Sequence, residues 1–579
     1  MLLPILLAVS VLSAGSPSGT VDERIRTLVN PVRIVWTSQS TGYGGCTVEH
    51  ADALLRGEPY CSTLPQRPVP ACKMVSNSDT AAVLVDFGRE LHGGVKIGVG
   101  GFVRRHRIRV RFGESAAEAM ADLGEKAASN DHATRDVTLE VPSFGSLEFG
   151  LTGFRFVRID LLTPGEFRLQ TLQAVSVERR MERLGSFRCS DGRLNAIYET
   201  AVRTAHLCCQ DQLWDGIKRD RLVWMGDTHP ETMTLLSAFG RAQILPETLE
   251  FIARYTPPDK WMNGMPTYTL WWLRNVYEWY LWTADRDWLA GHAGYIKATL
   301  DNVLANVTPA GEWGGGPGRG YFLDHQSGRI CPEGQKDGAQ GLFFLALRDS
   351  KVLMEALGDA DRAAKCDAAM GKLRALPRLD PRGLKQAAAM LALSGLREPK
   401  EMFAESLGTR GHAGTTTFMG YYLLEGMSAA GEHGAAMRLV RDYWGGMLDL
   451  GATSFWEDFD LAWTNGVARI DELPKPGQGD VHADNGQGTC YVGYRHSFCH
   501  GWESGPAPWL VRHVLGVEIL EPGASRVRVM PYLGDLAWAE GEVPLAKGIL
   551  RLRHEKRADG TISTKILNCP EGVKLETMR

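Results

Sequence analysis

Acidic residues and tryptophan are concentrated in one segment of the chain, residues 214–227, whose sequence is WDGIKRDRLVWMGD. Three carboxylates, those of Asp215, Asp220 and Asp227, occur within 13 residues of one another. Two carboxyl groups can act as a general acid and a general base, and an indole ring can stack on the apolar face of a sugar. A solvated loop would explain the charges but not the apolar residues between them. The segment is therefore a candidate active-site segment.

A second acidic segment, GATSFWEDF at residues 451–459, follows about 230 residues later. Its Glu457 is flanked by Trp456 and Phe459, and desolvation by such neighbours can tune the pKa of a carboxyl group. The aromatic rings could also hold a sugar. The competing interpretation is a surface acid beside core aromatic residues.

A third cluster, YVGYRHSFCHGWESGPAPW at residues 491–509, contains His496 and His500. Histidines four residues apart can bind a metal ion from one face of a helix. Gly501 and Pro506 argue against a continuous helix here, and no glutamate follows the first histidine as in zinc proteases. We therefore predict no metal site.

Other chemistries lack their sequence motifs. The chain contains no G-x-S-x-G, G-x-G-x-x-G or P-loop motif, so we predict no nucleotide or other cofactor. Lys and Arg total 64 against 68 Asp and Glu, and the resulting net charge of -4 gives no overall positive field for nucleic acid. The 16 tryptophans beside this modest acidic excess fit a carbohydrate-binding protein better.

Hydrophobic periodicity changes twice along the chain. Alternation with a period of two, as at Ile108, Val110 and Phe112, predicts an antiparallel β-sandwich over residues 25–183. Helical spacing dominates residues 184–515, which are long enough for about a dozen helices arranged as a double ring, an α/α toroid. A helical solenoid would need a fixed-period repeat, which this sequence lacks.

Strand patterns return over residues 516–579. The segments LRLRHEKRA and TISTKIL flank Asp559-Gly560, a dipeptide that favours a hairpin turn. A small C-terminal β-sandwich is predicted.

Residues 1–17, MLLPILLAVSVLSAGSP, combine an apolar stretch with small residues and predict a signal peptide, hence a periplasmic or secreted location. No Lys or Arg precedes the apolar stretch, unlike the usual signal. We expect no membrane span elsewhere. The 11 cysteines form no C-x-x-C unit, and we expect buried thiols in place of a disulfide framework or a zinc site.

Both acidic segments resemble those of the glycoside hydrolase family 78 α-L-rhamnosidases. DGIKRDRLVWMGD has the length and spacing of the family's D-C-P-x-R-E-R-x-G-W-x-G-D, and GATSFWEDF resembles its G-A-T-T-x-W-E. HSFCHGWESGPAPWL is similar to the segment that closes the helical barrel in these enzymes, and YEWYLWTADRDWL to one of its helix ends. FGES and NDHATRD, at residues 112–115 and 130–136, are similar to the sandwich that precedes the barrel. The resemblance covers nearly the whole chain after the signal.

This resemblance implies a multidomain protein with an all-α (α/α)6 barrel flanked by an N-terminal β-sandwich and a small C-terminal β-sandwich. It implies an exo-acting glycoside hydrolase that releases terminal α-L-rhamnose from plant or microbial glycans or glycosides with inversion. By position Asp220 would be the general acid and Glu457 the general base, while Asp215 and Asp227 would bind rhamnose hydroxyls. The further substrate contacts that we expect are Arg219, Trp224, Trp456, His500 and Trp502.

Two departures from the family pattern keep alternatives open. The usual acid is Glu, whereas Asp220 is one methylene shorter, and the usual D-C-P start is D-G-I here. The barrel could therefore hydrolyse another terminal sugar or a uronic acid, or bind carbohydrate without turnover. The sequence determines neither the aglycone and linkage nor the oligomeric state.

Overall fold

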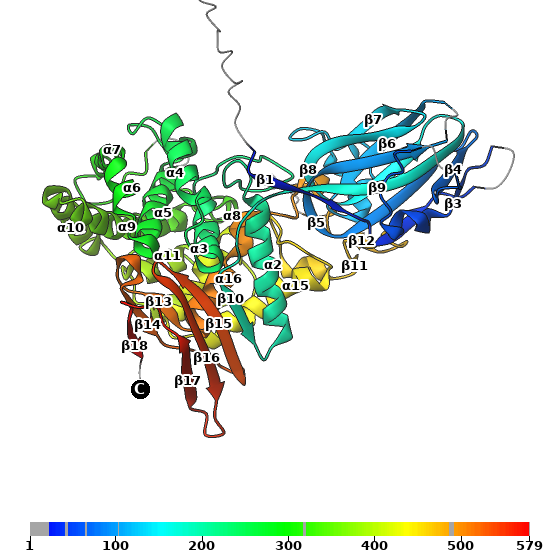
Figure 1. Ribbon diagram of the computed structural model, residues 1–579. Coiled ribbons are helices and arrows are strands. Elements are labelled where there is room, and N and C mark those ends of the chain that lie inside the picture. Colours follow the sequence, from blue (N-terminus) through cyan, green and yellow to red (C-terminus); the bar gives the residue numbers. More distant parts are fainter. Residues whose placement is uncertain are drawn as a thin grey trace, which may run out of the picture.

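The computed structural model describes residues 22–40, 44–63, 66–101, 104–316, 320–485 and 491–577, which form three regions (Figure 1). The predicted signal peptide at residues 1–17 lies outside the described residues. No helix in the described part of the chain is both long enough and apolar enough to cross a membrane.

The N-terminal region is a nine-stranded sheet in which every strand pair is antiparallel. Its strand order is β3-β4-β9-β5-β8-β6-β7, with β1 added to β9 and β2 to β5. The strands are β1 (Arg24–Val29), β2 (Arg33–Thr37), β3 (Thr47–Glu49), β4 (Cys72–Ser76), β5 (Ala81–Gly100), β6 (His106–Gly113), β7 (Asp136–Val141), β8 (Gly145–Leu161) and β9 (Gly165–Arg179). The predicted alternation in β6 is confirmed, because Ile108, Val110 and Phe112 are buried in the core of this sheet.

The middle region is helical and runs from α2 to α16. Its helices are α2 (Gly192–Cys208), α3 (Thr228–Phe239), α4 (Ile244–Tyr255), α5 (Pro266–Thr283), α6 (Arg286–Gly291), α7 (Ala293–Ala305), α8 (His325–Ile330), α9 (Pro332–Ala356), α10 (Ala360–Arg374), α11 (Lys385–Ser394), α12 (Pro399–Met402), α13 (Thr417–Ala429), α14 (His433–Leu439), α15 (Gly445–Asp449) and α16 (Pro506–Trp509). Asp191 caps helix α2, because its side chain accepts hydrogen bonds from the backbone N–H groups of Arg193 and Leu194.

Burial separates the helices into two layers. All twelve residues of α3 are buried, as is nearly all of α13, which is the pattern of helices surrounded by protein on every side. Helix α10 instead buries one stripe and exposes the rest. Because the final helix α16 packs against α2 and α3, the first and last helices meet and the ring of helices closes.

Two small sheets form the C-terminal region. One has the order β10-β15-β16-β17 and the other the order β13-β14-β18. The strands are β10 (Ser186–Cys189), β13 (Val517–Ile519), β14 (Arg526–Val529), β15 (Trp538–Leu545), β16 (Gly548–Lys556), β17 (Ile562–Asn568) and β18 (Lys574–Thr577). The predicted hairpin is confirmed, since Lys556 pairs with Ile562 across the Asp559-Gly560 turn. The domain boundaries need one correction: β10, assigned from the sequence to the helical region, pairs with β15, because backbone pairing does not follow chain order.

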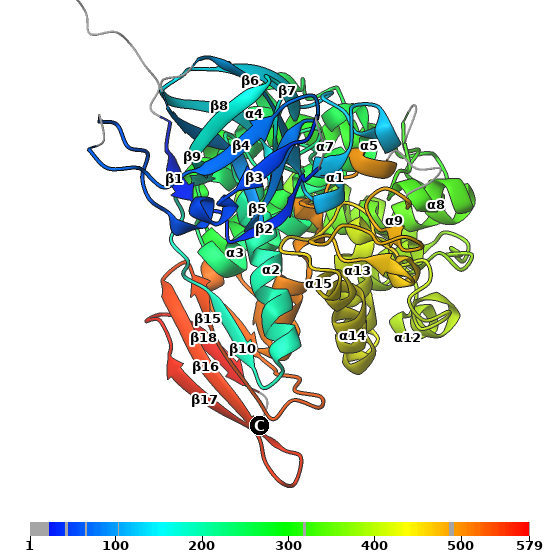
Figure 2. The ribbon, with the colours of Figure 1, turned by 90° about the vertical axis from the view of Figure 1, so that its right-hand side faces the viewer.

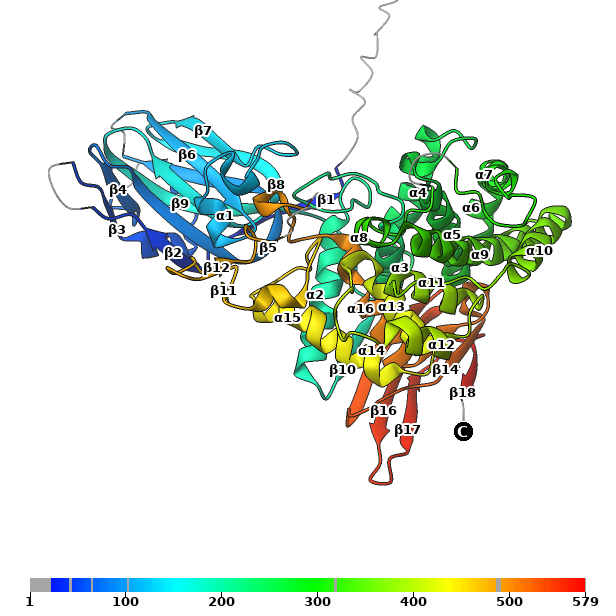
Figure 3. The same ribbon diagram turned by 180° about the vertical axis from the view of Figure 1, so that it is seen from behind.

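The two flanking regions join the helices in different ways. Figures 1 and 3 show the N-terminal sheet at one side of the helical region and the C-terminal sheets below it, and Figure 2 turns the N-terminal side toward the viewer. The N-terminal sheet has an apolar core of its own. Residues of the C-terminal strands, such as Val527, Val543 and Leu550, belong to the same continuous core as the helices.

Candidate active site

The first acidic segment is the connection between α2 and α3, and local hydrogen bonds fix its shape. Asp215 donates its backbone N–H to the carbonyl of Leu222 at 2.9 Å, and its side chain accepts from the N–H of Leu222 at 2.9 Å. The Gly501 N–H binds the Asp215 carbonyl at 2.8 Å, which ties this loop to the third cluster. The segment ends at Asp227, directly before the first residue of α3, where the helix dipole favours a negative charge.

The second acidic segment is held by backbone contacts on both sides of Glu457. Its backbone N–H donates to the Ser497 carbonyl at 3.0 Å, and its carboxylate accepts from the Ser497 N–H at 3.2 Å. Its carbonyl accepts from Thr417 at 2.6 Å and from the Trp502 indole at 3.2 Å. Glu457 is buried, and these bonds leave its carboxyl group little freedom to move.

Three of the predicted acids converge on one imidazole. The Nε2 atom of His500 lies 3.5 Å from Asp215, 3.7 Å from Glu457 and 3.9 Å from Asp227. Tyr268 donates its hydroxyl to Asp227 at 2.7 Å. The structure therefore brings residues from all three sequence clusters into a single site.

Burial dominates the electrostatics of this site. Desolvation, followed by repulsion from Asp220, raises the pKa of Asp215 well above its ordinary value. Desolvation and the charge of Asp215 do the same to the pKa of Asp227. Burial, and then the charge of Arg219, lower the pKa of His500 well below its ordinary value, so its imidazole is neutral at pH 7. The two aspartates retain protons to a higher pH than free aspartate and can donate as well as accept hydrogen bonds.

Arg219 connects the two proposed catalytic carboxylates. Its guanidinium pairs with both oxygens of Glu457 and lies 3.4 Å from the Asp220 carboxylate. Asp220 and Glu457 are 237 residues apart in sequence but within reach of one side chain. They therefore face a common site, as the sequence predicts.

Asp220 differs from the other acids in exposure and backbone conformation. Its side chain is 21% exposed, whereas Asp215 and Glu457 are buried. Asp220 and Arg221 have φ angles of 51° and 55°, and two successive left-handed residues of this kind cost about 1–3 kcal/mol each. The Trp224 indole donates to Asp220 at 3.2 Å. This strained turn holds the more exposed Asp220 carboxylate beside the buried acids, close enough to Asp215 to raise its pKa.

The N-terminal sheet contributes residues that sequence reasoning did not select. His132, in the loop between β6 and β7, places its Nε2 atom 3.5 Å from Asp220. Arg221 donates to the carbonyls of His132 and Leu151 at 2.8 Å, which fixes the strained turn to this sheet. The NDHATRD motif was the available signal, but spacing alone does not show that its histidine reaches Asp220.

A buried charge cluster connects the same sheet to both acidic segments. The Lys218 ammonium lies 2.8 Å from Glu118 and 3.4 Å from Glu114. Glu114 accepts from the Phe498 N–H at 2.6 Å and from the Ser497 hydroxyl at 3.3 Å, and so supports the irregular segment whose Ser497 backbone holds Glu457. Glu114, Glu118 and His482 are close enough to bind a cation, but the Lys218 ammonium already supplies a positive charge there.

Two of the predicted tryptophan contacts need correction. The Trp456 ring is 1% exposed and stacks on Phe498 with ring centroids 4.1 Å apart, so it lies in the core. Trp502 is stacked on Phe418 at 5.0 Å and covered on its other side by His500 at 4.1 Å. An indole that is covered on both faces cannot stack on a sugar, and Trp502 instead positions His500. Trp224 is half-buried and remains beside Asp220.

Comparison with known proteins relates the chain to the same enzymes as its sequence motifs do. The family model for the bacterial alpha-L-rhamnosidase 6 hairpin glycosidase domain matches residues 182–294. The matched residues run from α2 to α6, the first helices of the helical region. The resemblance predicted from the sequence is confirmed at the level of this family model and of the fold. The residues matched by the family model include the segment from Asp215 to Asp227 and end before Glu457.

Solved structures with this domain superpose on most of the chain. The GH78 family rhamnosidase of Bacillus sp. GL1 has a TM-score of 0.70 at 20% identity, covering 91% of this chain and 56% of that one. The rhamnosidase from Klebsiella oxytoca with rhamnose bound has a TM-score of 0.61 at 20% identity, covering 85% and 96%. The Streptomyces avermitilis alpha-L-rhamnosidase complexed with L-rhamnose has a TM-score of 0.67 at 16% identity, covering 86% and 48%.

The chain thus spans about half the length of the Bacillus and Streptomyces enzymes. No curated protein matches its sequence.

Proposed function

We propose that this protein is an exo-acting glycoside hydrolase that releases terminal α-L-rhamnose with inversion of configuration. The observation that carries the proposal is the contact of Arg219 with both Asp220 and Glu457, beside an imidazole surrounded by three carboxylates. An inverting hydrolase needs two carboxyl groups on opposite sides of the scissile bond, with room for a water molecule between them. The shared Arg219 guanidinium brings both carboxyl groups to one site, which such a mechanism requires.

The environments of the two carboxylates support different roles. Asp220 is partly exposed, at the outer side of the site, where it can donate a proton to the departing glycosidic oxygen. Glu457 is buried and fixed by the Ser497 N–H, a position suited to activating water on the opposite ring face. Asp215 and Asp227, with their raised pKa values, would bind the rhamnose hydroxyls.

Space for the leaving group lies next to Asp220. A hollow of about 550 Å³ is lined by Asn130–Thr134 and Phe149–Leu151 of the N-terminal sheet and by Arg221. Because His132 in this lining contacts Asp220, we propose that the hollow receives the aglycone. An exo-acting enzyme would bind the terminal sugar among the buried acids and place the aglycone on this more exposed side.

The decisive experiment is proton NMR of the first product formed from an aryl α-L-rhamnoside. The initial product is expected to be the β-anomer. Asp220→Asn and Glu457→Gln are each expected to lower kcat about 10²–10⁴-fold with a smaller effect on KM, because each group acts in the transition state. Near wild-type turnover in both variants would contradict the assignment.

One observation favours a second candidate, a sugar-binding protein without turnover. Glu457 is already paired with Arg219, and an arginine partner weakens a carboxylate as a base. The second candidate predicts sugar binding without product. Release from an α-L-fucoside, α-D-mannoside or β-glucuronide, and not from the rhamnoside, would instead identify another terminal sugar.

We also propose that the protein acts in the periplasm or outside the cell, on the basis of the apolar segment at residues 1–17. Cell fractionation, with N-terminal sequencing of the mature chain, tests this location.

A further inference from the structure

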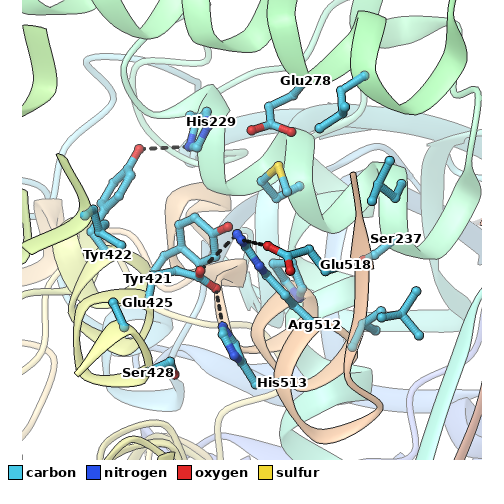
Figure 4. Close-up of a pocket in the computed structure, with 18 of the residues that line it drawn as sticks. His229, Ser237, Glu278, Tyr421, Tyr422, Glu425, Ser428, Arg512, His513 and Glu518 are labelled. Atoms are coloured by element: carbon cyan, nitrogen blue, oxygen red, sulfur yellow. Dashed lines mark hydrogen bonds and ion pairs between the residues drawn. The ribbon is translucent and has the colours of Figure 1, made fainter. Parts of the chain in front are cut away.

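A second cavity lies away from the acids described above, where the helical region meets the C-terminal sheets. Its volume is about 600 Å³, and its lining includes none of the predicted site residues. The walls come from helices α3, α5, α9, α11 and α13, from the helical turn η9 (Leu510–Val514) and from strands β13 and β14. Figure 4 shows the side chains that point into this space from these separate elements. A volume of this size is within the range of small-molecule sites.

One wall of the cavity is a fully paired charge network. Arg512 contacts Glu425 at 3.1 Å and Glu518 at 2.9 Å, and His513 contacts Glu425 at 3.1 Å (Figure 4). Although burial opposes ionisation, Arg512 and His513 lower the pKa of Glu425 to about 2. The charged groups of this wall are thus paired with one another.

Two polar groups on the other walls are unused. Glu278 is 8% exposed, and its carboxyl group makes no hydrogen bond or ion pair with any residue that the structure describes. Tyr421 is 4% exposed, and its hydroxyl likewise has no hydrogen-bond partner among the described residues. Buried polar groups are normally hydrogen-bonded, and a group without a protein partner calls for water or a ligand.

The same cavity includes further unused hydrogen-bonding capacity. His229 binds Tyr422 through Nδ1 at 3.0 Å, but its Nε2 has no partner in the described part of the chain. Arg274, four residues before Glu278 on α5, binds Asp349 at 3.0 Å through Nε and leaves Nη1 without a described partner. Both of these atoms are shielded within the cavity wall, so Glu278 and Tyr421 remain the groups without protein partners that a ligand could reach.

Charge selects among the ligand classes that could satisfy these groups. The four guanidiniums in the lining all have carboxylate partners: Arg274 and Arg348 pair with Asp349, Arg512 with Glu425 and Glu518, and Arg528 with Glu518. No unpaired guanidinium of this lining thus remains to attract an anion, and the unpaired Glu278 would repel one.

A neutral ligand with several hydroxyl groups meets these conditions. Its hydroxyls can donate to Glu278 and exchange hydrogen bonds with Tyr421, while the rings of Tyr421 and Tyr422 supply flat apolar surfaces for C–H groups. We propose that this cavity is a second binding site, separate from the acid cluster, for a free sugar or sugar alcohol.

Equilibrium dialysis with labelled L-rhamnose, D-glucose and D-mannitol tests the proposal on the full chain. At least one of these probes is expected to bind, and Glu278→Gln and Tyr421→Phe are each expected to weaken that binding about tenfold or more, since each removes a hydrogen bond to the ligand. Glu355→Gln is the matched control, because Glu355 is 56% exposed on the same helix region as Arg348.

Glu457→Gln and Asp227→Asn separate the two sites. Binding in the cavity is expected to persist in both Glu457→Gln and Asp227→Asn, whereas binding at the acid cluster should weaken in Asp227→Asn, which alters a proposed sugar contact, and be unchanged in Glu278→Gln and Tyr421→Phe. Near-ultraviolet circular dichroism shows whether each variant retains its tertiary structure. The proposal is overturned if no probe binds at concentrations up to about 50 mM, or if binding is unaffected by both cavity variants. Neither outcome depends on hydrolysis, so the proposed function can fail or succeed independently.

Discussion

The N-terminal and C-terminal β regions flank the same helical domain but contact it through different kinds of interaction. The N-terminal sheet has its own apolar core and reaches the helical domain through charged and hydrogen-bonded groups and two small apolar clusters. Arg155, for example, donates to the Gly451 carbonyl at 2.8 Å, and Thr453 accepts from the Glu90 N–H at 2.8 Å. The C-terminal strands instead share one continuous apolar core with the helices.

This difference indicates different roles. Polar contacts are directional, and those of the N-terminal sheet end on the loops that hold Asp220 and Glu457. Apolar burial is not directional and stabilises the shared core of the C-terminal region in proportion to its area. We expect changes at the N-terminal interface to affect catalysis and changes at the C-terminal interface to affect stability alone.

The largest expected effect comes from the buried cluster at the N-terminal interface. Lys218→Met leaves the buried Glu114 without its cation and Glu118 with Arg135 alone, and should lower the free energy of unfolding by about 3–5 kcal/mol. Displacement of the Asp220 loop should also reduce kcat about 100-fold. Urea unfolding and rhamnoside hydrolysis measure the two effects.

Lys126→Met is the matched control for this variant. Lys126 also forms an ion pair across the interface, with Asp484, but its side chain is 46% exposed, so its loss should cost less than about 1 kcal/mol. Equal unfolding midpoints for the two variants would contradict the importance of the buried cluster.

A core truncation in the C-terminal region provides the opposite test. Leu550 is fully buried in the shared core, and Leu550→Ala should lower the free energy of unfolding by about 2–5 kcal/mol. Its kcat, measured where the variant is fully folded, should equal that of the wild type. Leu567→Ala, at a side chain that is 52% exposed, should change stability by less than about 0.5 kcal/mol. A loss of turnover in folded Leu550→Ala would contradict the expectation that changes in the C-terminal region affect stability alone.

Glu278, in the cavity beside the C-terminal sheets, should make the free energy of unfolding depend on pH. Burial, then repulsion by Asp349, raises the pKa of Glu278 to about 7 from its ordinary value of 4.5. The folded protein therefore binds more protons than the unfolded chain between these two values, and its stability falls as the pH rises through this interval. Because glutamine does not titrate, the free energy of unfolding of Glu278→Gln should decrease by up to about 3 kcal/mol less than that of the wild type over this interval.

Urea midpoints at about pH 5 and about pH 8 measure this change, with Glu355→Gln as the exposed control. The Glu278→Gln variant should gain stability over the wild type at the higher pH and little at the lower one. An equal gain at both pH values would show that Glu278 does not titrate in this range.

The smallest expected effect concerns His132, which reaches Asp220 from the N-terminal sheet. His132→Ala removes one polar neighbour of the proposed acid and should lower kcat/KM about fivefold, the equivalent of about 1 kcal/mol. A positioning role should also move one limb of the pH profile of kcat/KM, which a merely structural role would not. Arg105→Ala, at a side chain that is 78% exposed, is the control. An unchanged pH profile would leave His132 without influence on the acid.

Several local features could be predicted from the sequence because each is encoded within a few residues. The alternation in β6, the Asp191 cap of α2 and the turn between β16 and β17 all depend on neighbours along the chain. The two acidic segments could be identified for the same reason, since their residue types and spacing are local.

Other features depend on residues that only folding brings together. Trp456 and Trp502 are suitable for stacking on a sugar by type, but Phe498, Phe418 and His500 cover their faces. Strand β10 lies in the chain next to the helices and pairs with β15 about 350 residues later. Composition does not reveal which aromatic face is covered or which strand is the partner.

By itself the sequence determined the order of the three regions and the identity of the acids, because hydrophobic period and residue type act over short distances. The tertiary structure alone decided that Arg219 lies between Asp220 and Glu457, and that Lys218 is enclosed by carboxylates of the N-terminal sheet. Electrostatic interactions depend on separation in space and on burial, and both are set by how distant elements pack.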